Sequence, residues 1–161
     1  MAFEIVWESL GVRKRFWGFV TIPELVESVV KPLGDSRFER IRYVIHDFLD
    51  VEEHDITEAA IAGIAAISGA GQSVNPNINI AILTTCDKIK NLAWLYSSRI
   101  LATYPVRIFS SRDEANEWLE SAPPRKAPGP FVRGTHAFME VAKPESYERT
   151  PAAPTPNSSE I

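Results

Sequence analysis

The sequence of 161 residues has a single cysteine and three histidines, and it has no long hydrophobic run. One cysteine excludes an intrachain disulfide framework and fits a reducing compartment. No apolar stretch reaches the ~18 residues that a membrane-spanning helix needs, and the opening residues MAFEIVWESL lack the basic and apolar regions of a secretion signal. We therefore expect a cytoplasmic protein without a membrane span.

The sequence also lacks an excess of positive charge, since its formal net charge is −4. Nucleic-acid affinity comes mainly from neutralising phosphates, so this balance argues against a nucleic-acid partner. Apolar residues make up 45% of the chain, which is enough to build a buried core.

Proline is unevenly distributed, because eight of the twelve prolines fall in residues 122–161. Residues 1–121 therefore form the predicted folded domain, and residues 122–161 form a Pro-rich tail that is largely extended or disordered. An apolar island at 131–141 interrupts this tail and contains Phe131 and Phe138. We expect the island either to dock on another surface or to pack loosely near the domain.

The first 121 residues alternate between strand and helix patterns. Alternating apolar residues at 2–8 and 12–20 predict an antiparallel hairpin. Mostly apolar, β-branched runs at 41–48 and 78–85 predict central strands. Residues 105–109 are predicted to form a last strand. Helical patterns follow from Thr21 to Gly34, around 59–67, from Asp87 to about Thr103, and from Ser111 to about Ser121. The order ββαβαβαβα predicts an α/β fold with a mixed five-stranded sheet and about four helices.

This order of elements resembles the stand-alone SpoIIAA-like branch of the STAS domains, the sulphate-transporter and anti-sigma-factor-antagonist modules. The resemblance covers roughly residues 3–120 and rests on VIHDFLDVEEHDITEAAI, INIAILTTCD and VRIFSSRDEANEWLES. It implies a regulatory or protein-binding module. The fold is also similar to that of CRAL-TRIO lipid carriers, so a small apolar ligand is a second implication.

In the anti-sigma antagonists, an Asp-Ser-Ser-Gly type segment opens a helix, and its first serine is phosphorylated. The corresponding residues here are Asp55, Ile56, Thr57 and Glu58, so the phosphorylated position has no hydroxyl. Thr57 is the remaining candidate phosphorylation site. A simpler interpretation is that its hydroxyl caps the helix, and nearby carboxylates would repel a phosphate.

The densest polar cluster begins at His46 and lies at the carboxyl end of a predicted strand, where open α/β sheets place their ligands. We predict that its acidic loop contacts a protein partner through Asp50, Glu52, Glu53, His54 and Asp55. A metal site is the alternative, but no two-histidine spacing matches a known motif, and neighbouring strand residues point to opposite faces. We therefore expect no metal or other cofactor.

The remaining candidates are a helix and a basic stretch. The helix from Asp87 is apolar over much of its circumference, and Trp94 lies on its widened stripe, which indicates a dimer interface, a ligand pocket or a neighbouring helix. Arg13 and Arg15 share one face of a predicted strand, and Lys14 takes the other. These residues are interpreted as solvated charges that protect a sheet edge, and a partner-facing edge is the alternative. Cys86 is interpreted as a structural thiol.

Two functions remain open from the sequence. The first is a non-enzymatic module that binds a protein partner and forms a homodimer, with the acidic loop, Trp94, Phe131 and Phe138 as contact residues. The second is a carrier or sensor of a small apolar ligand, for which we expect an enclosed cavity of about 300 Å³ or more. No residue set supplies the nucleophile, base and orienting group of an enzyme.

Overall fold

The first two strands form the antiparallel hairpin that their alternating pattern predicts. In the computed structural model, which describes residues 1–100 and 104–123, β1 (Phe3–Glu8) pairs with β2 (Gly11–Val20). The inward positions Val12, Phe16 and Val20 of β2 are fully buried. Their burial fixes the register of the hairpin, because a shift by one residue would expose all three.

The rest of the described chain alternates helices and parallel strands. The elements are α1 (Ile22–Leu33), β3 (Tyr43–His54), α2 (Glu58–Ala70), β4 (Asn79–Leu83), α3 (Asp87–Ile100), β5 (Val106–Phe109) and α4 (Arg112–Ser121). The sheet has the order β1-β2-β3-β4-β5, and all pairs after the hairpin are parallel. This confirms the predicted α/β fold with a mixed five-stranded sheet.

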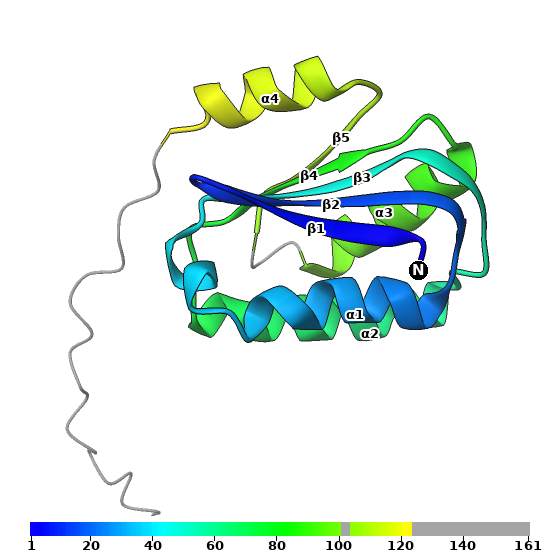
Figure 1. The fold of residues 1–161 in the computed structure, drawn as a ribbon, viewed down its shortest axis with the longest axis horizontal. Helices are drawn as coiled ribbons and strands as arrows, with labels where there is room; N and C mark the ends of the chain where they lie inside the picture. Colours follow the sequence, from blue (N-terminus) through cyan, green and yellow to red (C-terminus); the bar gives the residue numbers. More distant parts are fainter. Residues whose placement is uncertain (101–103, 124–161) are drawn as a thin grey trace, which may run out of the picture. The chain divides into compact units, whose positions relative to one another are not determined.

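Helices cover the two faces of the sheet unequally. α1, α2 and α3 lie on one face, and α4 lies on the other (Figure 1). The main core lies between the sheet and the three helices, and Phe16 and Phe48 stack within it with ring centroids 4.5 Å apart. A smaller cluster under α4 contains Ile45, Leu83 and Ala115.

Side-chain caps set the starts of three helices, as the sequence predicts. Thr21 and Glu24 form a reciprocal capping box at α1. The hydroxyls of Thr57 and Ser111 accept the backbone N–H groups of Ala60 and Glu114 at the starts of α2 and α4. These bonds satisfy donors that a helix N-terminus otherwise leaves unpaired.

Two expectations about local structure are wrong, and two short helices are additional. β3 does not end at Phe48 but continues to His54, because β2 keeps pairing with it along the acidic stretch. Two 3₁₀ helices, η1 (Ser36–Arg40) and η2 (Gly71–Ser73), were not predicted. Lys14 is not a solvated charge, since its side chain faces the helices and the residue is only 3% exposed.

Residues 124–161 of the predicted Pro-rich tail fall outside the described residues, as does its apolar island at 131–141 with Phe131 and Phe138. The end of the helix predicted to reach Thr103 also falls outside them. Within residues 1–100 and 104–123, no helix is long and apolar enough to cross a membrane.

Candidate interaction surface

The central strands β2 and β3 continue together past both of their neighbours. The ladder between β1 and β2 ends at Phe16, with one further backbone hydrogen bond from Trp17 N–H to Ala2 at 3.1 Å, and β4 pairs with β3 only as far as Asp47. Beyond these points, residues 17–20 of β2 pair with residues 50–54 of β3. We call this two-stranded extension the ribbon end. It lies at the carboxyl end of the parallel strands, where α/β folds place their functional residues.

The ribbon end carries two exposed aromatic side chains. Trp17 is 38% exposed and Phe19 is 52% exposed, whereas Phe16 and Val20 on the same strand are fully buried. Between the aromatics, Gly18 has a φ of 61° at an irregularity in the pairing with β3. A left-handed backbone there favours glycine, and such irregularities redirect the side chains next to them.

Three acidic residues face solvent on the β3 side of the ribbon end. Asp50 is paired in the sheet with Trp17, and Glu53 with Phe19, while Glu52 lies between them in sequence. Glu52 and Glu53 are exposed and make no hydrogen bond or ion pair with the residues that the structure describes. The ribbon end therefore combines exposed apolar area with free carboxylates.

The other residues of the predicted acidic cluster hold the backbone in place. Asp55 accepts the backbone N–H of Ile22 at 2.7 Å, at the start of α1. The Nδ1 atom of His54 accepts the backbone N–H of Ile56 at 3.2 Å, and its Nε2 atom is buried without a partner among the described residues. The cluster thus divides into a structural part and an exposed part.

Thr57 lies at the start of α2, where its exposed hydroxyl accepts the N–H of Ala60 at 3.2 Å. This geometry agrees with the interpretation of Thr57 as a capping residue. Phosphorylation at Thr57 stays a prediction.

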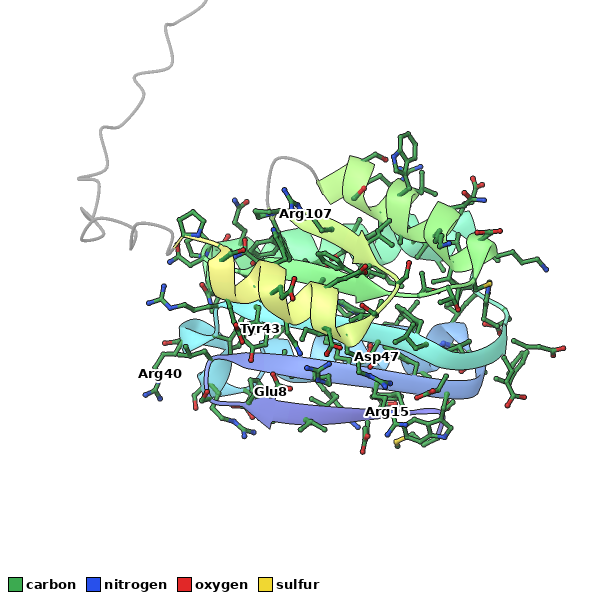
Figure 2. All side chains as sticks on the ribbon, turned by 90° about the horizontal axis from the view of Figure 1, so that it is seen from above. Glu8, Arg15, Arg40, Tyr43, Asp47 and Arg107 are labelled. Carbon is green, nitrogen blue, oxygen red and sulfur yellow. The ribbon has the colours of Figure 1, made fainter. Side chains whose placement is uncertain are left out.

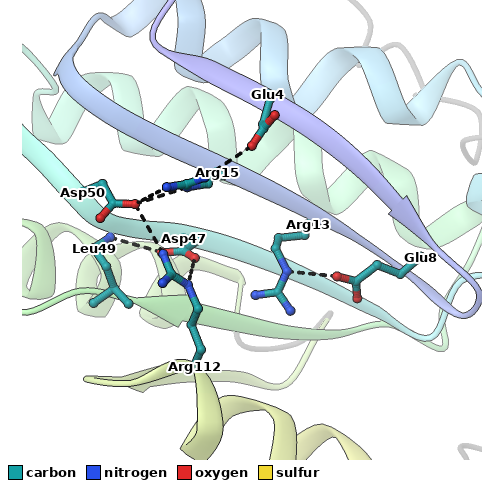
Figure 3. A network of polar contacts seen from close by, with 8 residues as sticks. All are labelled: Glu4, Glu8, Arg13, Arg15, Asp47, Leu49, Asp50 and Arg112. Atoms are coloured by element: carbon teal, nitrogen blue, oxygen red, sulfur yellow. Dashed lines mark hydrogen bonds and ion pairs between the residues drawn. The ribbon is translucent and has the colours of Figure 1, made fainter.

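The charged side chains on the sheet face beside α4 are paired with one another. α4 covers part of this face, and Glu8 and Arg15 lie on the uncovered part (Figure 2). Figure 3 shows the pairs: Arg13 Nε donates to Glu8 at 2.9 Å, and Arg15 bridges Glu4 and Asp50. The hydrogen bonds from Arg15 lower the pKa of Asp50. Because these charges neutralise one another, this face is less suited to a charged partner than the ribbon end is.

Tyr43 lies on β3 where β2 begins, opposite Gly11. Its hydroxyl donates to Glu8 at 2.6 Å, and burial together with that carboxylate raises the pKa of Tyr43 to about 12. A Cβ atom at Gly11 would lie 2.1 Å from the Tyr43 ring. Gly11 therefore leaves the space that the ring occupies.

Asp47 is the buried member of the network in Figure 3. Its side chain is 1% exposed and accepts a hydrogen bond from Arg112 Nε at 2.7 Å, which fastens α4 to β3. Asp47 raises the pKa of Arg112. His46, the preceding residue, faces α1 and α2 instead, so the two side chains do not converge on a metal. No cluster of metal-ligating side chains was found among residues 1–100 and 104–123.

Trp94 is exposed on α3, with 68% of its surface open to solvent. It lies on a different element from the ribbon end, so the predicted contact residues do not all come from one segment. Leu95, the next residue of that helix, is partly buried and packs against the main core. The apolar breadth of the helix is therefore explained in part by packing within one chain.

Sequence reasoning did not select Trp17 and Phe19 as contact residues. Their alternation with Phe16 and Val20 was visible, and it placed them on the outward face. What the sequence could not show is that β1 and β4 stop short and leave these aromatics beside Asp50 and Glu53.

Comparison with known proteins gives one informative result. No family model matches the chain, and no curated protein sequence is significantly similar to it. A solved structure, that of the anti-sigma factor antagonist SpoIIAA in its unphosphorylated form, aligns with 75% of this chain and 100% of its own, with a TM-score of 0.51. The chain has the SpoIIAA fold. At 12% sequence identity, the likeness to SpoIIAA concerns the fold alone.

Proposed function

We propose that the protein is a non-enzymatic regulatory module that binds a protein partner through the ribbon end. The observation that carries this proposal is the pair of exposed aromatics, Trp17 and Phe19, beside the free carboxylates of Glu52 and Glu53. Aromatic side chains supply much of the binding energy at protein interfaces, and charges at the rim steer the encounter. A partner with an apolar pocket bordered by basic residues fits this surface.

The SpoIIAA fold supports the proposal by analogy, since SpoIIAA is described as an anti-sigma factor antagonist. The serine that the resemblance places in the switch of such proteins is replaced here by Ile56. We therefore infer a module whose binding does not depend on phosphorylation at that position. A homodimer and a cytoplasmic location remain predictions.

The test uses a matched pair of variants of the full chain. Phe19→Ala removes an aromatic that is 52% exposed, and Val74→Ala removes an apolar side chain that is 51% exposed on another part of the surface. Both positions are open to solvent, so we expect both variants to fold, as checked by circular dichroism. Tagged wild-type and variant chains are then used for co-purification from the native cell.

We expect the wild type and Val74→Ala to recover the same partner, and Phe19→Ala to lose at least about tenfold in affinity for it. Glu52→Gln with Glu53→Gln should slow association and reduce its dependence on salt. Recovery of no partner, or equal affinity for Phe19→Ala and Val74→Ala, would overturn the proposal.

A further inference from the structure

Lys14 is a buried lysine in the middle of the sheet. It lies on β2 directly opposite His46 of β3, and both side chains face the layer formed by α1, α2 and α3. Lys14 is 3% exposed and His46 is 7% exposed. Within the described part of the chain, the Lys14 ammonium group has no hydrogen bond or ion pair. Lysine is rarely buried to this degree without a partner.

A cavity of about 30 Å³ adjoins Lys14, which is enough space for ordered water or part of a small molecule. The polar side chains in its wall are Lys14, His46, Ser68, Tyr96 and Tyr104, and the rest of the wall is aliphatic or aromatic. None of the carboxylates in the described part of the chain lines this cavity. The wall therefore offers a cation and hydroxyl groups but no anion to balance the cation.

Among the described residues of the cavity wall, the protonation states leave Lys14 as the only potential positive charge. Burial lowers the pKa of Lys14 to about 7. Burial lowers the pKa of His46 well below its usual value, and the charge of Lys14 lowers it further, so the imidazole is neutral. Burial raises the pKa of Tyr96 to about 12, so that phenol is also neutral near pH 7. An anion placed here would meet one cation and no repelling charge.

A second cavity, of about 40 Å³, shares two wall residues with the first, His46 and Tyr96. The other residues in its wall are apolar: Leu25, Phe48, Ile56, Ile61, Ile64, Ile82, Ile89, Leu92 and Ala93. Both spaces are far smaller than the enclosed cavity of about 300 Å³ expected of a carrier that encloses a small apolar ligand. The cavity beside Lys14 can therefore hold a charged group, and the neighbouring cavity can hold an aliphatic one.

We propose that these two cavities form a binding site for a small aliphatic monocarboxylate. Its carboxylate would accept a hydrogen bond from the Lys14 ammonium, and its short chain would extend past His46 and Tyr96 into the apolar cavity. The ion pair supplies the partner that Lys14 lacks, and the chain fills space lined by aliphatic side chains. This site is separate from the ribbon end and goes beyond the proposed function.

The test measures the binding of hexanoate, hexanol and hexylamine to the full chain by titration calorimetry. We expect hexanoate to bind, hexanol to bind much more weakly and hexylamine not to bind, because only the carboxylate carries the negative charge that balances the ammonium. Shortening hexanoate to butanoate should weaken binding by about fourfold for each methylene removed from the apolar cavity. Lys14→Met keeps the apolar volume and should abolish the preference for the acid over the alcohol.

The matched control is Lys88→Met, which removes the charge of an exposed lysine at the start of α3 and should leave hexanoate binding unchanged. Affinity of the wild type should fall about tenfold per unit as the pH rises above the pKa of Lys14, because only the protonated amine pairs with the carboxylate. The proposal is overturned by an absence of hexanoate binding, by equal binding of acid and alcohol, or by hexanoate binding that survives in Lys14→Met.

Discussion

At the scale of single residues, burial determines the behaviour of Lys14. The folded state holds its pKa at about 7, whereas the ordinary value of 10.5 applies to the unfolded chain. The unfolded state therefore binds more protons between these two values, and the folded state gains stability as the pH rises through that window. Below about pH 7 the full cost of burying the charge is present.

Lys14→Met should accordingly be more stable than the wild type at about pH 7, by several kcal/mol, because a shift of this size corresponds to roughly 1.4 kcal/mol per pKa unit. Urea unfolding of both proteins between about pH 7 and 9 measures this difference. The free energy of unfolding of the wild type should rise towards that of the variant with each increase in pH. This range avoids the titration of Tyr43 and Tyr96, whose pKa values are raised to about 12. A constant difference between the two proteins would show that Lys14 does not titrate in this window.

Sequence could place Lys14 on the opposite face from Arg13 and Arg15, but it could not show what covers that face. Alternation along β2 fixes the direction of each side chain, whereas burial depends on helices that arrive later in the chain. The same holds for Gly11, whose need for a hydrogen side chain arises from the ring of Tyr43 across the sheet. Both residues owe their roles to tertiary contacts.

At the scale of elements, Arg112 joins α4 to β3 through ion pairs with two acidic residues. Arg112 donates to the buried Asp47 at 2.7 Å and also contacts Asp50 at 3.3 Å. The apolar contacts of α4 are few, with Ala115 buried and Trp118 and Leu119 partly buried. The helix is therefore held by charge as much as by apolar burial.

Arg112→Met should destabilise the folded protein by about 2–3 kcal/mol, since it leaves a buried carboxylate without its cation. The cost falls below that of a fully buried pair because the Arg112 side chain is 45% exposed. Adding Asp47→Asn to the Arg112→Met variant should restore most of the lost stability, because the asparagine carries no charge that needs a cation. Urea unfolding of the wild type, both single variants and the double variant measures the coupling energy between Arg112 and Asp47. If the stability losses of the two single variants simply add in the double variant, the prediction is wrong.

The order and type of the elements were predictable because apolar periodicity and capping residues lie close together in sequence. The helix bounds from Thr21 to Gly34 and the cap at Ser111 are examples. The length of β3 was not predictable, since Asp50, Glu52 and Glu53 are poor strand formers and only pairing with β2 holds them extended. The exposed aromatics beside them depend on that same pairing.

At the scale of the whole molecule, the chain divides into Met1–Gly129 and Pro130–Ile161. The main core and the smaller cluster under α4 both lie within the first unit. The predicted domain of residues 1–121 and its boundary with the tail stay predictions. The first unit thus contains a core that is sufficient to explain its own fold.

A chain ending at Gly129 should therefore unfold with the same free energy as the full chain, within about 0.5 kcal/mol. Tryptophan fluorescence can follow both transitions, because all four tryptophans lie in the first unit. A clear loss of stability on truncation would show that residues after Gly129 pack against the domain, and the predicted boundary would then be wrong.

The strand order β1-β2-β3-β4-β5 has a consequence for how the chain is made. Each strand pairs with the strand that precedes it, so every new strand finds its neighbour already synthesised. Short sequence separations between pairing partners lower the entropic cost of closing each loop and speed folding. The sheet can grow from the N-terminal hairpin towards β5 as the chain leaves the ribosome. No strand has to be inserted later between two strands that have already paired.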